Sequence, residues 1–140
     1  MPLLVVRHAP AGERADAVGD DRLRPLDERG RRQAENLPRL LERFPIDRIA
    51  SSSYLRCTQT VEPLAEARGV GVETRVELEE DAAREDSLAL LAELGDAAVL
   101  CTHGDVLENL FGEEGEKGST RVVELRDRDP VVLEYLAPPA

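Results

Sequence analysis

The sequence predicts an α/β fold, in which buried strands alternate with amphipathic helices. Two apolar runs of strand length, residues 3–6 and 98–102, lack polar alternation, as is typical of strands buried on both faces. Segments with apolar residues at helical spacing lie between these runs, and two stretches of alternating pattern follow the second run. The chain has 140 residues, 41% of them apolar, which is enough for a hydrophobic core. We expect residues 1–140 to form a single domain.

The N-terminal third predicts a strand, a long loop and a helix. The strand at residues 3–7 is followed by a polar segment, residues 10–21, that is rich in turn formers and charge. A loop of this length in a compact domain is usually functional or mobile. Asp27 stands where the N-cap of a helix is expected, and Pro38 predicts a kink in that helix. The apolar stripe of the helix consists of Leu37, Leu40, Leu41 and Phe44.

The middle of the chain predicts a second strand and two further helices. Residues 46–50 form a short apolar segment, and a serine cluster at 51–53 leads into a helix that ends at Gly69. Residues 70–78 alternate weakly, which indicates an edge strand or a loop. Residues 87–94 have the pattern of an amphipathic helix. The core-facing residues of the first of these helices are Val61, Leu64 and Ala65.

The C-terminal part predicts a short helix, a loop and a hairpin. The helix follows the second apolar run and ends at Leu110. Residues 112–118 are glycines and charged residues, which predicts an exposed, flexible loop. Residues 121–125 and 131–136 have the alternation of paired strands, with the turn of the hairpin at 127–130.

The net charge of −11 argues against several classes of partner. Nucleic acids and anionic membranes attract basic proteins, so neither is expected to bind here. A small phosphorylated substrate remains compatible, because it meets the local pocket rather than the mean surface. We see no signal peptide and no apolar run long enough to cross a bilayer, and we expect a cytoplasmic protein. Cys57 and Cys101 lack metal-ligand or redox spacing, and we expect no metal and no cofactor.

Two histidines and two arginines stand where a ligand site would form. Arg7 and His8 end the first apolar run, His103 ends the second, and Arg56 follows the serine cluster. In open α/β sheets, ligands bind outside the carboxyl ends of the strands. One such histidine is more often a hydrogen-bonded core residue, and Arg56 by itself is better interpreted as a solvated surface residue. Both histidines of the chain at strand ends, one of them beside an arginine, favour a site.

These residue types suit phosphoryl chemistry. The forked donors of two arginines fit a dianionic phosphoryl group. A neutral imidazole is a nucleophile towards phosphorus, and neighbouring cations keep it deprotonated. A protonated second histidine stabilises charge in the transition state, and a carboxylic acid protonates the departing oxygen. The acidic cluster around Glu80 follows a weak strand and is a candidate for that acid. No step in this chemistry needs a metal.

Four segments occur in the order and at roughly the spacing of a known family. They are Val6-Arg7-His8-Ala9, residues 51–60, Leu78-Glu79-Glu80 and Cys101-Thr102-His103-Gly104. The set resembles the histidine phosphatase superfamily, also called phosphoglycerate mutase-like. Residues 21–26, followed by Gly30 and Gln33-Ala34, resemble its small bacterial branch of phosphohistidine phosphatases. Lys117-Gly118-Ser119 and residues 56–65 are similar to the phosphatase domain that follows the Nudix domain in some actinobacterial hydrolases. No Nudix signature is present, so we expect a free-standing version of that domain.

The resemblance implies a three-layer α/β sandwich with a mostly parallel central sheet flanked by helices. It also implies that His8 is the nucleophile and forms a phosphohistidine, and that Glu80 occupies the acid position. The segment after Glu80 lacks the glycine-rich acidic pattern of the mutases, so Asp20, Asp21 and Arg24 stay open as alternative pocket residues. The substrate-binding residues that we expect are Arg7, Arg56, His103, Arg24 and Asp21.

The sequence is compatible with three functions. The first is a metal-independent phosphatase acting on a small phosphomonoester or on a phosphohistidine protein; the nitrogen leaving group of phosphohistidine needs less help from an acid. The second is a mutase, which the missing insertions disfavour because retaining the intermediate needs a closed pocket. The third is a catalytically weak phosphate-binding or regulatory module, favoured by the short segment at 111–119.

Overall fold

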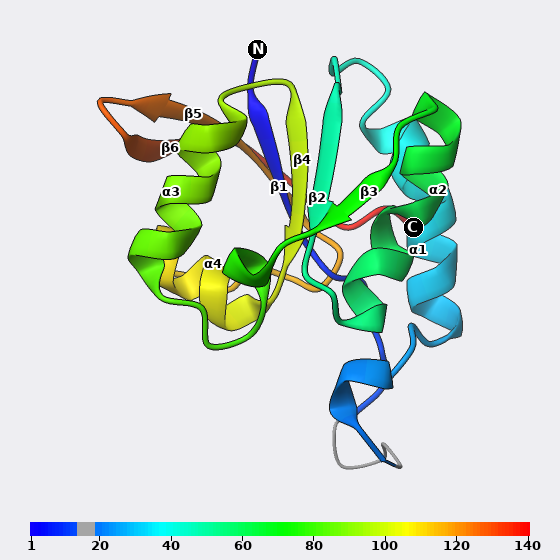
Figure 1. Ribbon diagram of the computed structural model, residues 1–140. Helices are drawn as coiled ribbons and strands as arrows, with labels where there is room; N and C mark the ends of the chain where they lie inside the picture. Colours follow the sequence, from blue (N-terminus) through cyan, green and yellow to red (C-terminus); the bar gives the residue numbers. More distant parts are fainter. Residues whose placement is uncertain (14–18) are drawn as a thin grey trace.

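The computed structural model describes residues 1–13 and 19–140, which fold into a mixed sheet with helices on both faces (Figure 1). The strand order in these residues is β3-β2-β4-β1-β5-β6. The strands are β1 (Leu3–Arg7), β2 (Arg48–Ser51), β3 (Val72–Thr74), β4 (Ala98–Thr102), β5 (Thr120–Arg126) and β6 (Asp129–Leu136). The helices are α1 (Glu28–Leu40), α2 (Leu55–Arg68), α3 (Arg84–Leu94) and α4 (Gly104–Phe111), with 3-10 turns η2 (Asp21–Leu23) and η3 (Val76–Leu78).

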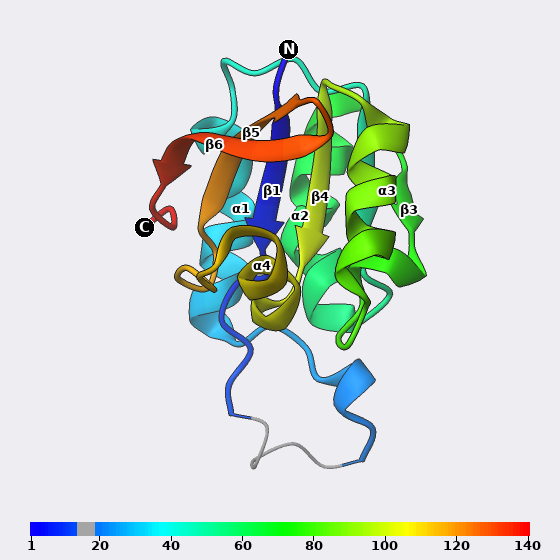
Figure 2. The same cartoon turned by 90° about the vertical axis from the view of Figure 1, so that its left-hand side faces the viewer.

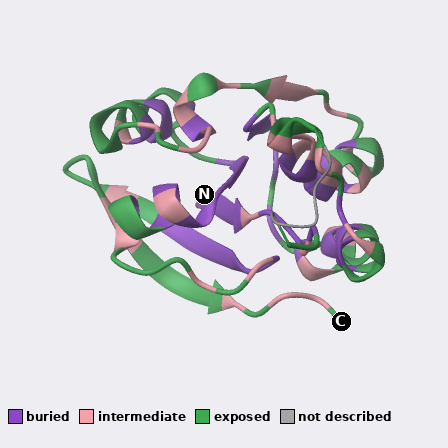
Figure 3. Ribbon diagram, turned by 90° about the horizontal axis from the view of Figure 1, so that it is seen from below, coloured by how far each residue is buried: buried purple, intermediate pink, exposed green. Residues whose placement is uncertain are grey.

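The central strands carry apolar side chains to both faces, and each face is covered by one pair of helices. On one face Leu4 and Val6 of β1 pack with residues of α1 and α2, and on the other Leu3 and Val5 pack with residues of α3 and α4. Figures 1 and 2 show the two pairs on opposite sides of the sheet, and Figure 3 shows the buried strands between helices whose outer faces are exposed. The continuous apolar runs of β1 and β4 are explained by this burial on both faces. The predicted three-layer α/β sandwich is confirmed.

The sheet is mostly parallel, as expected. Strand β4 lies between β1 and β2 and is parallel to both, and β3 is parallel to β2. Strands β5 and β6 add an antiparallel hairpin beside β1. The carboxyl ends of the parallel strands therefore meet at one edge of the sheet, the lower edge in Figures 1 and 2. The segments that leave this edge carry the residues selected from the sequence.

Most predicted elements are confirmed, with shifted boundaries. Asp27 caps α1 by accepting the Gly30 N–H at 2.8 Å, and α1 continues past Pro38 to end at Leu40. The second strand is shifted towards the serine cluster, and the third helix begins three residues before the predicted start at 87. Residues 70–78 divide into the short edge strand β3 and the turn η3. None of the helices in the described residues has the length and apolar content needed to span a bilayer.

The C-terminal hairpin is tighter than predicted. Its turn consists of Asp127 and Arg128, with φ angles of 51° and 71°, the left-handed pair that a two-residue turn requires. Pro130 was placed in the turn by its sequence context, but it lies in β6 opposite Leu125. A proline is tolerated there because β6 is at the edge of the sheet, where a missing N–H interrupts no inner ladder.

Candidate active site

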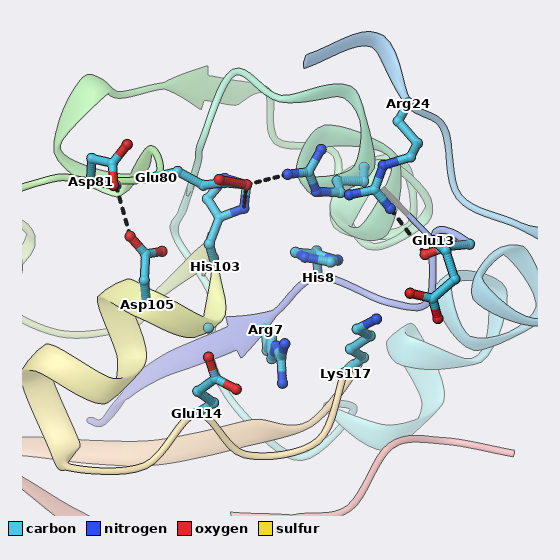
Figure 4. Close-up of a pocket in the computed structure, with 13 residues that line it drawn as sticks. Arg7, His8, Glu13, Arg24, Glu80, Asp81, His103, Asp105, Glu114 and Lys117 are labelled. Carbon is cyan, nitrogen blue, oxygen red and sulfur yellow. Dashed lines mark hydrogen bonds and ion pairs between the residues drawn. The ribbon is translucent and has the colours of Figure 1, made fainter. Parts of the chain in front are cut away.

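The carboxyl edge of the sheet holds a cavity of about 510 Å³. It gathers six of the residues selected from the sequence: Arg7, His8, Arg24, Arg56, Glu80 and His103. All of these except Arg56 are labelled in Figure 4. The other lining residues are Gly12, Glu13, Asp81, Gly104, Asp105, Glu114 and Lys117. Asp20 and Asp21 do not line the cavity.

His8 is buried at the end of β1 and held in one tautomer. Its backbone N–H donates to the Thr102 carbonyl of β4 at 3.1 Å, and Nδ1 lies 2.8 Å from the Ala9 carbonyl oxygen. A carbonyl oxygen only accepts, so Nδ1 carries the proton and Nε2 keeps its electron pair. Burial lowers the pKa of His8 to about 3; the Ala9 carbonyl raises this pKa, and the charges of Arg56, Arg7 and Lys117 lower it further. His8 is therefore a neutral imidazole at neutral pH, and its Nε2 has no hydrogen-bond partner among the described residues.

The backbone beside His8 is tied to helix α2 through one hydroxyl. Thr60 Oγ1 accepts the Ala9 N–H at 3.0 Å and donates to the Arg56 carbonyl at 2.7 Å. This link joins the turn of α2 that carries Arg56 to the segment that carries His8. Two residues 48 positions apart in the sequence, His8 and Arg56, are thus held in a fixed relation.

Arg56 is buried, and its interpretation as a surface residue is wrong. Its side chain is 1% exposed in the first turn of α2, where the helix dipole disfavours a cation. Two carboxylates offset the charge of Arg56, because its guanidinium donates to Asp21 Oδ2 at 3.2 Å and to Glu80 Oε1. The guanidinium also donates to the backbone carbonyl of Asp21 at 2.9 Å. Its Nε is buried and has no hydrogen-bond partner among the described residues. The sequence could not show this, because both acids are more than twenty positions away.

Arg7 is held by the loop that precedes β5. Its Nη1 donates to the Gly115 carbonyl at 2.6 Å, while its Nε is buried without a partner in the described part of the chain. Gly104 leaves room for these side chains, because a Cβ there would lie 3.0 Å from Arg7 Nη2 and 3.0 Å from Glu114 Oε1. Figure 4 shows Arg7 between Glu114 and Lys117.

The predicted exposed loop at 112–118 is only partly exposed. Residues 112–114 are exposed, but Gly118 is buried, and its N–H is shared between the Arg7 and His8 carbonyls at 3.1 and 3.0 Å. This packing places Lys117 at the cavity, a residue that our reasoning from side-chain chemistry missed. Two signals in the sequence point to it: Lys117 is the only lysine, and it stands in a segment that contributed to the family resemblance.

His103 lies at the end of β4 and is 2% exposed. Its Nε2 is 2.8 Å from Ser52 Oγ and 3.5 Å from Cys57 Sγ, and its Nδ1 is 3.7 Å from Glu80 Oε1. The rings of His8 and His103 are 5.5 Å apart between centroids, so the two strand ends do bring the two histidines together. A His103 that accepts from Ser52 at Nε2 directs a proton on Nδ1 towards Glu80.

The three candidate residues at positions 20–24 differ in their position relative to the cavity. Arg24 lines the cavity and donates from Nη1 to the Ala11 and Gly12 carbonyls at 2.8 and 3.1 Å, which shapes the wall of the cavity. Asp21 accepts from Arg24 Nε at 2.9 Å and from Arg56, so it connects the two arginines. Asp20 is exposed and caps η2 by accepting the Arg22 N–H at 2.9 Å.

The cavity lining combines four cationic side chains with five carboxylates, Glu13, Glu80, Asp81, Asp105 and Glu114. Arg7, Arg24, Arg56 and Lys117 supply positive charge around the neutral His8. Glu13, Asp81 and Glu114 are exposed carboxylates in the lining. Within residues 1–13 and 19–140, no group of three or more His, Cys, Asp or Glu side chains is arranged to hold a metal ion. The cations around His8 thus provide positive charge for an anion, and Glu80 offsets part of that charge through its ion pair with Arg56.

Comparison with known proteins establishes the family. A sequence model of the histidine phosphatase superfamily (branch 1) matches residues 3–86. The chain therefore belongs to the histidine phosphatase superfamily, as the resemblance predicted, and its fold is phosphoglycerate mutase-like. Family membership supports a hydrolase of the phosphatase class.

One curated relative and two solved structures are similar to nearly the whole chain. An 8-oxo-(d)GTP phosphatase of Mycolicibacterium smegmatis is 37% identical over 155 residues, covering 98% of this chain and 48% of the relative. The chain thus spans about half the length of this curated relative. The structure of the protein histidine phosphatase SixA complexed with tungstate superposes with a TM-score of 0.82 at 22% identity, covering 99% of this chain and 97% of SixA. A protein from Agrobacterium tumefaciens, provisionally named phosphohistidine phosphatase SixA, gives a TM-score of 0.79 at 26% identity, with 98% and 97% covered.

Proposed function

We propose that this protein is a metal-independent phosphatase that hydrolyses a phosphomonoester or phosphohistidine through a covalent phosphohistidine on His8. The observation that carries the proposal is the neutral, buried His8, which lines a cavity together with four cationic side chains. A nucleophile that stays unprotonated among cations is suited to attack a phosphoryl group whose negative charge those cations balance. The described residues share one sandwich, which supports a single histidine phosphatase domain over residues 1–140.

Phosphate binding is assigned to the arginines and to His103. The Nε groups of Arg7 and Arg56 are buried donors without partners among the described residues, and leaving such donors unsatisfied is unfavourable. A phosphoryl oxygen at hydrogen-bond distance from each donor satisfies both. Lys117, which also lines the cavity, adds a further positive charge. This assignment explains why a buried and a partly buried arginine are retained at one cavity of an acidic protein.

The reaction has two balanced steps. In the first, His8 Nε2 attacks phosphorus, the P–N bond forms, the bond to the leaving group breaks, and the leaving group takes a proton from an acid. In the second, water attacks the same phosphorus, the P–N bond breaks, and the acid residue takes back a proton from the water. Arg7, Arg56 and His103 stabilise the charge that builds up on the phosphoryl oxygens in both steps. The phosphoryl group leaves as inorganic phosphate.

Glu80 is the proposed acid. It lines the cavity, it contacts Arg56, and its Oε1 lies 3.7 Å from His103 Nδ1, so it stands beside two of the proposed phosphate-binding residues. An ion-paired carboxylate must first receive a proton before it can donate one. A phosphohistidine substrate reduces that demand, because its imidazole leaving group departs with less help than an alkoxide.

Two substrate classes have support. The structural neighbours named as histidine phosphatases favour a phosphohistidine protein, and the relative that shares 37% identity favours a nucleotide. The cavity of about 510 Å³ has space for part of a leaving group beside one phosphoryl group. The acidic surface disfavours long polyphosphates at low salt. We therefore propose a substrate with one terminal phosphoryl group on a small molecule or on a protein histidine.

The test is release of inorganic phosphate from a substrate panel by the wild-type protein, with and without EDTA. The panel contains p-nitrophenyl phosphate, a phosphohistidine protein, and a nucleoside monophosphate and triphosphate. We expect steady turnover of at least one substrate that EDTA does not reduce, and none in folded His8→Ala. Phosphate binding without turnover of any substrate would instead favour the weak binding module, and dependence on a bisphosphate primer would favour a mutase. Wild-type rates in His8→Ala would exclude His8 as the nucleophile.

A further inference from the structure

A buried cation lies outside the cavity, in strand β5. Arg121 is 4% exposed, and within the described part of the chain it forms no ion pair with a carboxylate. Its guanidinium lies over the rings of Phe111 and Tyr135, at 5.2 and 5.8 Å from the centroids. Burial lowers the pKa of Arg121, because a charge removed from water is destabilised. An apolar residue between the two rings would avoid the free-energy cost of burying a charge. We therefore expect the guanidinium to make a contact that an apolar residue could not make.

The guanidinium of Arg121 binds the backbone of the 112–119 loop. Nη2 donates to the Glu113 carbonyl at 2.8 Å and Nη1 to the Glu114 carbonyl at 3.4 Å. The next residue, Gly115, has a φ of +72°, and a Cβ there would lie 3.0 Å from both terminal nitrogens of Arg121. From the neighbouring strand β6, Tyr135 Oη accepts the Glu116 N–H at 3.0 Å. The hairpin therefore holds this loop at three backbone positions, the carbonyls of residues 113 and 114 and the amide of residue 116.

The same loop also accepts a hydrogen bond from Arg7 and carries Lys117, two of the cationic residues at the cavity. The Gly115 carbonyl accepts from Arg7 Nη1 at 2.6 Å, one residue beyond the carbonyls that Arg121 binds. Lys117 follows two residues later and lines the cavity, and its charge contributes to the lowered pKa of His8. The Ser119 carbonyl accepts the Arg7 N–H at 3.0 Å. A displacement of residues 113–116 would thus move the partner of Arg7 and the backbone of Lys117 together.

We propose that Arg121 is a positioning residue for phosphate binding, which acts by fixing the 112–119 loop so that Gly115 orients the guanidinium of Arg7 and Lys117 reaches the cavity. Arg121 itself does not line the cavity, so it does not touch the substrate. Tyr135 is its partner in this role. The proposal rests on the proposed function only in that the oxyanion binds in this cavity.

The test compares vanadate affinity and steady-state kinetics among point variants of the full chain. Arg121→Met removes the guanidinium and keeps an aliphatic side chain; Arg121→Lys keeps the charge and one donor; Tyr135→Phe removes the acceptor of the Glu116 N–H. Arg126→Met is the matched control, because Arg126 lies in the same strand, is exposed and contacts Glu124 at 3.4 Å. Vanadate binding is measured by calorimetry, and kcat and KM with p-nitrophenyl phosphate, at a temperature where circular dichroism shows every variant folded.

We expect Arg121→Met to weaken vanadate binding and to raise KM roughly tenfold, with a smaller change in kcat, as for a lost charge-assisted hydrogen bond. Arg121→Lys should recover part of the loss, Tyr135→Phe should shift the same quantities by a smaller factor, and Arg126→Met should match the wild type. Wild-type vanadate affinity in folded Arg121→Met would overturn the proposal and leave Arg121 a structural residue. If Arg121→Met does not fold, wild-type affinity in both Arg121→Lys and Tyr135→Phe would overturn it.

The vanadate-binding measurement and the kinetic measurement distinguish failure of this inference from failure of the proposed function. Vanadate binding tests the positioning role whether or not the protein turns over a substrate. Wild-type protein that binds vanadate but releases no phosphate from any ester would refute the proposed phosphatase, while the order of the variants in the binding arm would still decide the role of Arg121.

Discussion

Replacing His8 with Gln should make the protein less sensitive to acid. In the folded protein burial lowers the pKa of His8 to about 3, whereas in the unfolded chain it returns to about 6.5. Above pH 6.5 neither state binds a proton at this residue, so His8 causes no change of stability with pH there. As the pH falls from 6.5 towards 3, the unfolded state takes up a proton and the folded state does not, so the free energy of unfolding decreases.

The size of this effect follows from the shift in pKa. Each unit of difference corresponds to about 1.36 kcal/mol, so the complete loss between the two pKa values is about 5 kcal/mol. At about pH 5 the wild-type protein has lost about 2 kcal/mol of stability through His8 relative to about pH 7.5. A glutamine at position 8 has no titrating proton, so this component disappears. Titrating groups remote from His8 are present in both proteins and cancel in the comparison.

Urea denaturation of the wild type and His8→Gln across this pH range measures the effect. The expected result is a difference in the free energy of unfolding between the two proteins that changes by about 2 kcal/mol between about pH 7.5 and about pH 5, in favour of the variant at the acid end. Parallel stability profiles would show that His8 titrates alike in the folded and unfolded states. That result would refute the inference that a neutral imidazole is held among the cations of the cavity.

Three further substitutions test the roles assigned around His8. Glu80→Gln should slow hydrolysis of alkyl phosphates by about 10²–10⁴-fold and slow p-nitrophenyl phosphate far less, because nitrophenolate departs without a proton; equal slowing of both, measured in steady state, would argue against the acid role. Arg56→Ala should weaken vanadate binding by about tenfold or more in calorimetry, whereas Arg48→Ala, an exposed arginine paired with Glu73, should not change it; equal affinities would place Arg56 outside the binding set. Lys117→Met should raise the inhibition constant of inorganic phosphate about three- to tenfold with little change in kcat, and the loss should shrink at high salt; a loss confined to kcat would assign Lys117 a different role.

The strands and the strand-end residues could be predicted from the sequence because local patterns specify them. The runs that became β1 and β4 have apolar side chains at successive positions, since both faces of those strands are covered by helices. Parallel strands end at one edge, so placing His8 and His103 after such runs brought them into one cavity. The cap of α1 at Asp27 was predictable for a similar reason, because its hydrogen bond spans only three residues.

The environment of Arg56 and the course of the 112–119 loop could not be predicted in the same way. Arg56 is balanced by Asp21, 35 positions before it, and by Glu80, 24 positions after it. A local pattern shows the cation at a helix start but not the carboxylates that approach it from other elements. In the loop, three glycines and three glutamates are typical of an exposed connection. The contacts that hold it come from Arg121 and Tyr135 in the hairpin and from Arg7 in β1.

The most direct test of the central claim is detection of the phosphorylated enzyme. Wild-type protein is mixed rapidly with p-nitrophenyl phosphate, quenched in alkali and digested, and the peptide that contains residues 7–9 is examined by mass spectrometry. We predict a phosphoryl group on the imidazole of His8, stable in alkali, lost in acid, and missing in His8→Ala. A phosphoryl group on another residue would contradict the account. Full turnover by both the wild type and His8→Ala, with no phosphorylated peptide during the steady state, would also contradict it.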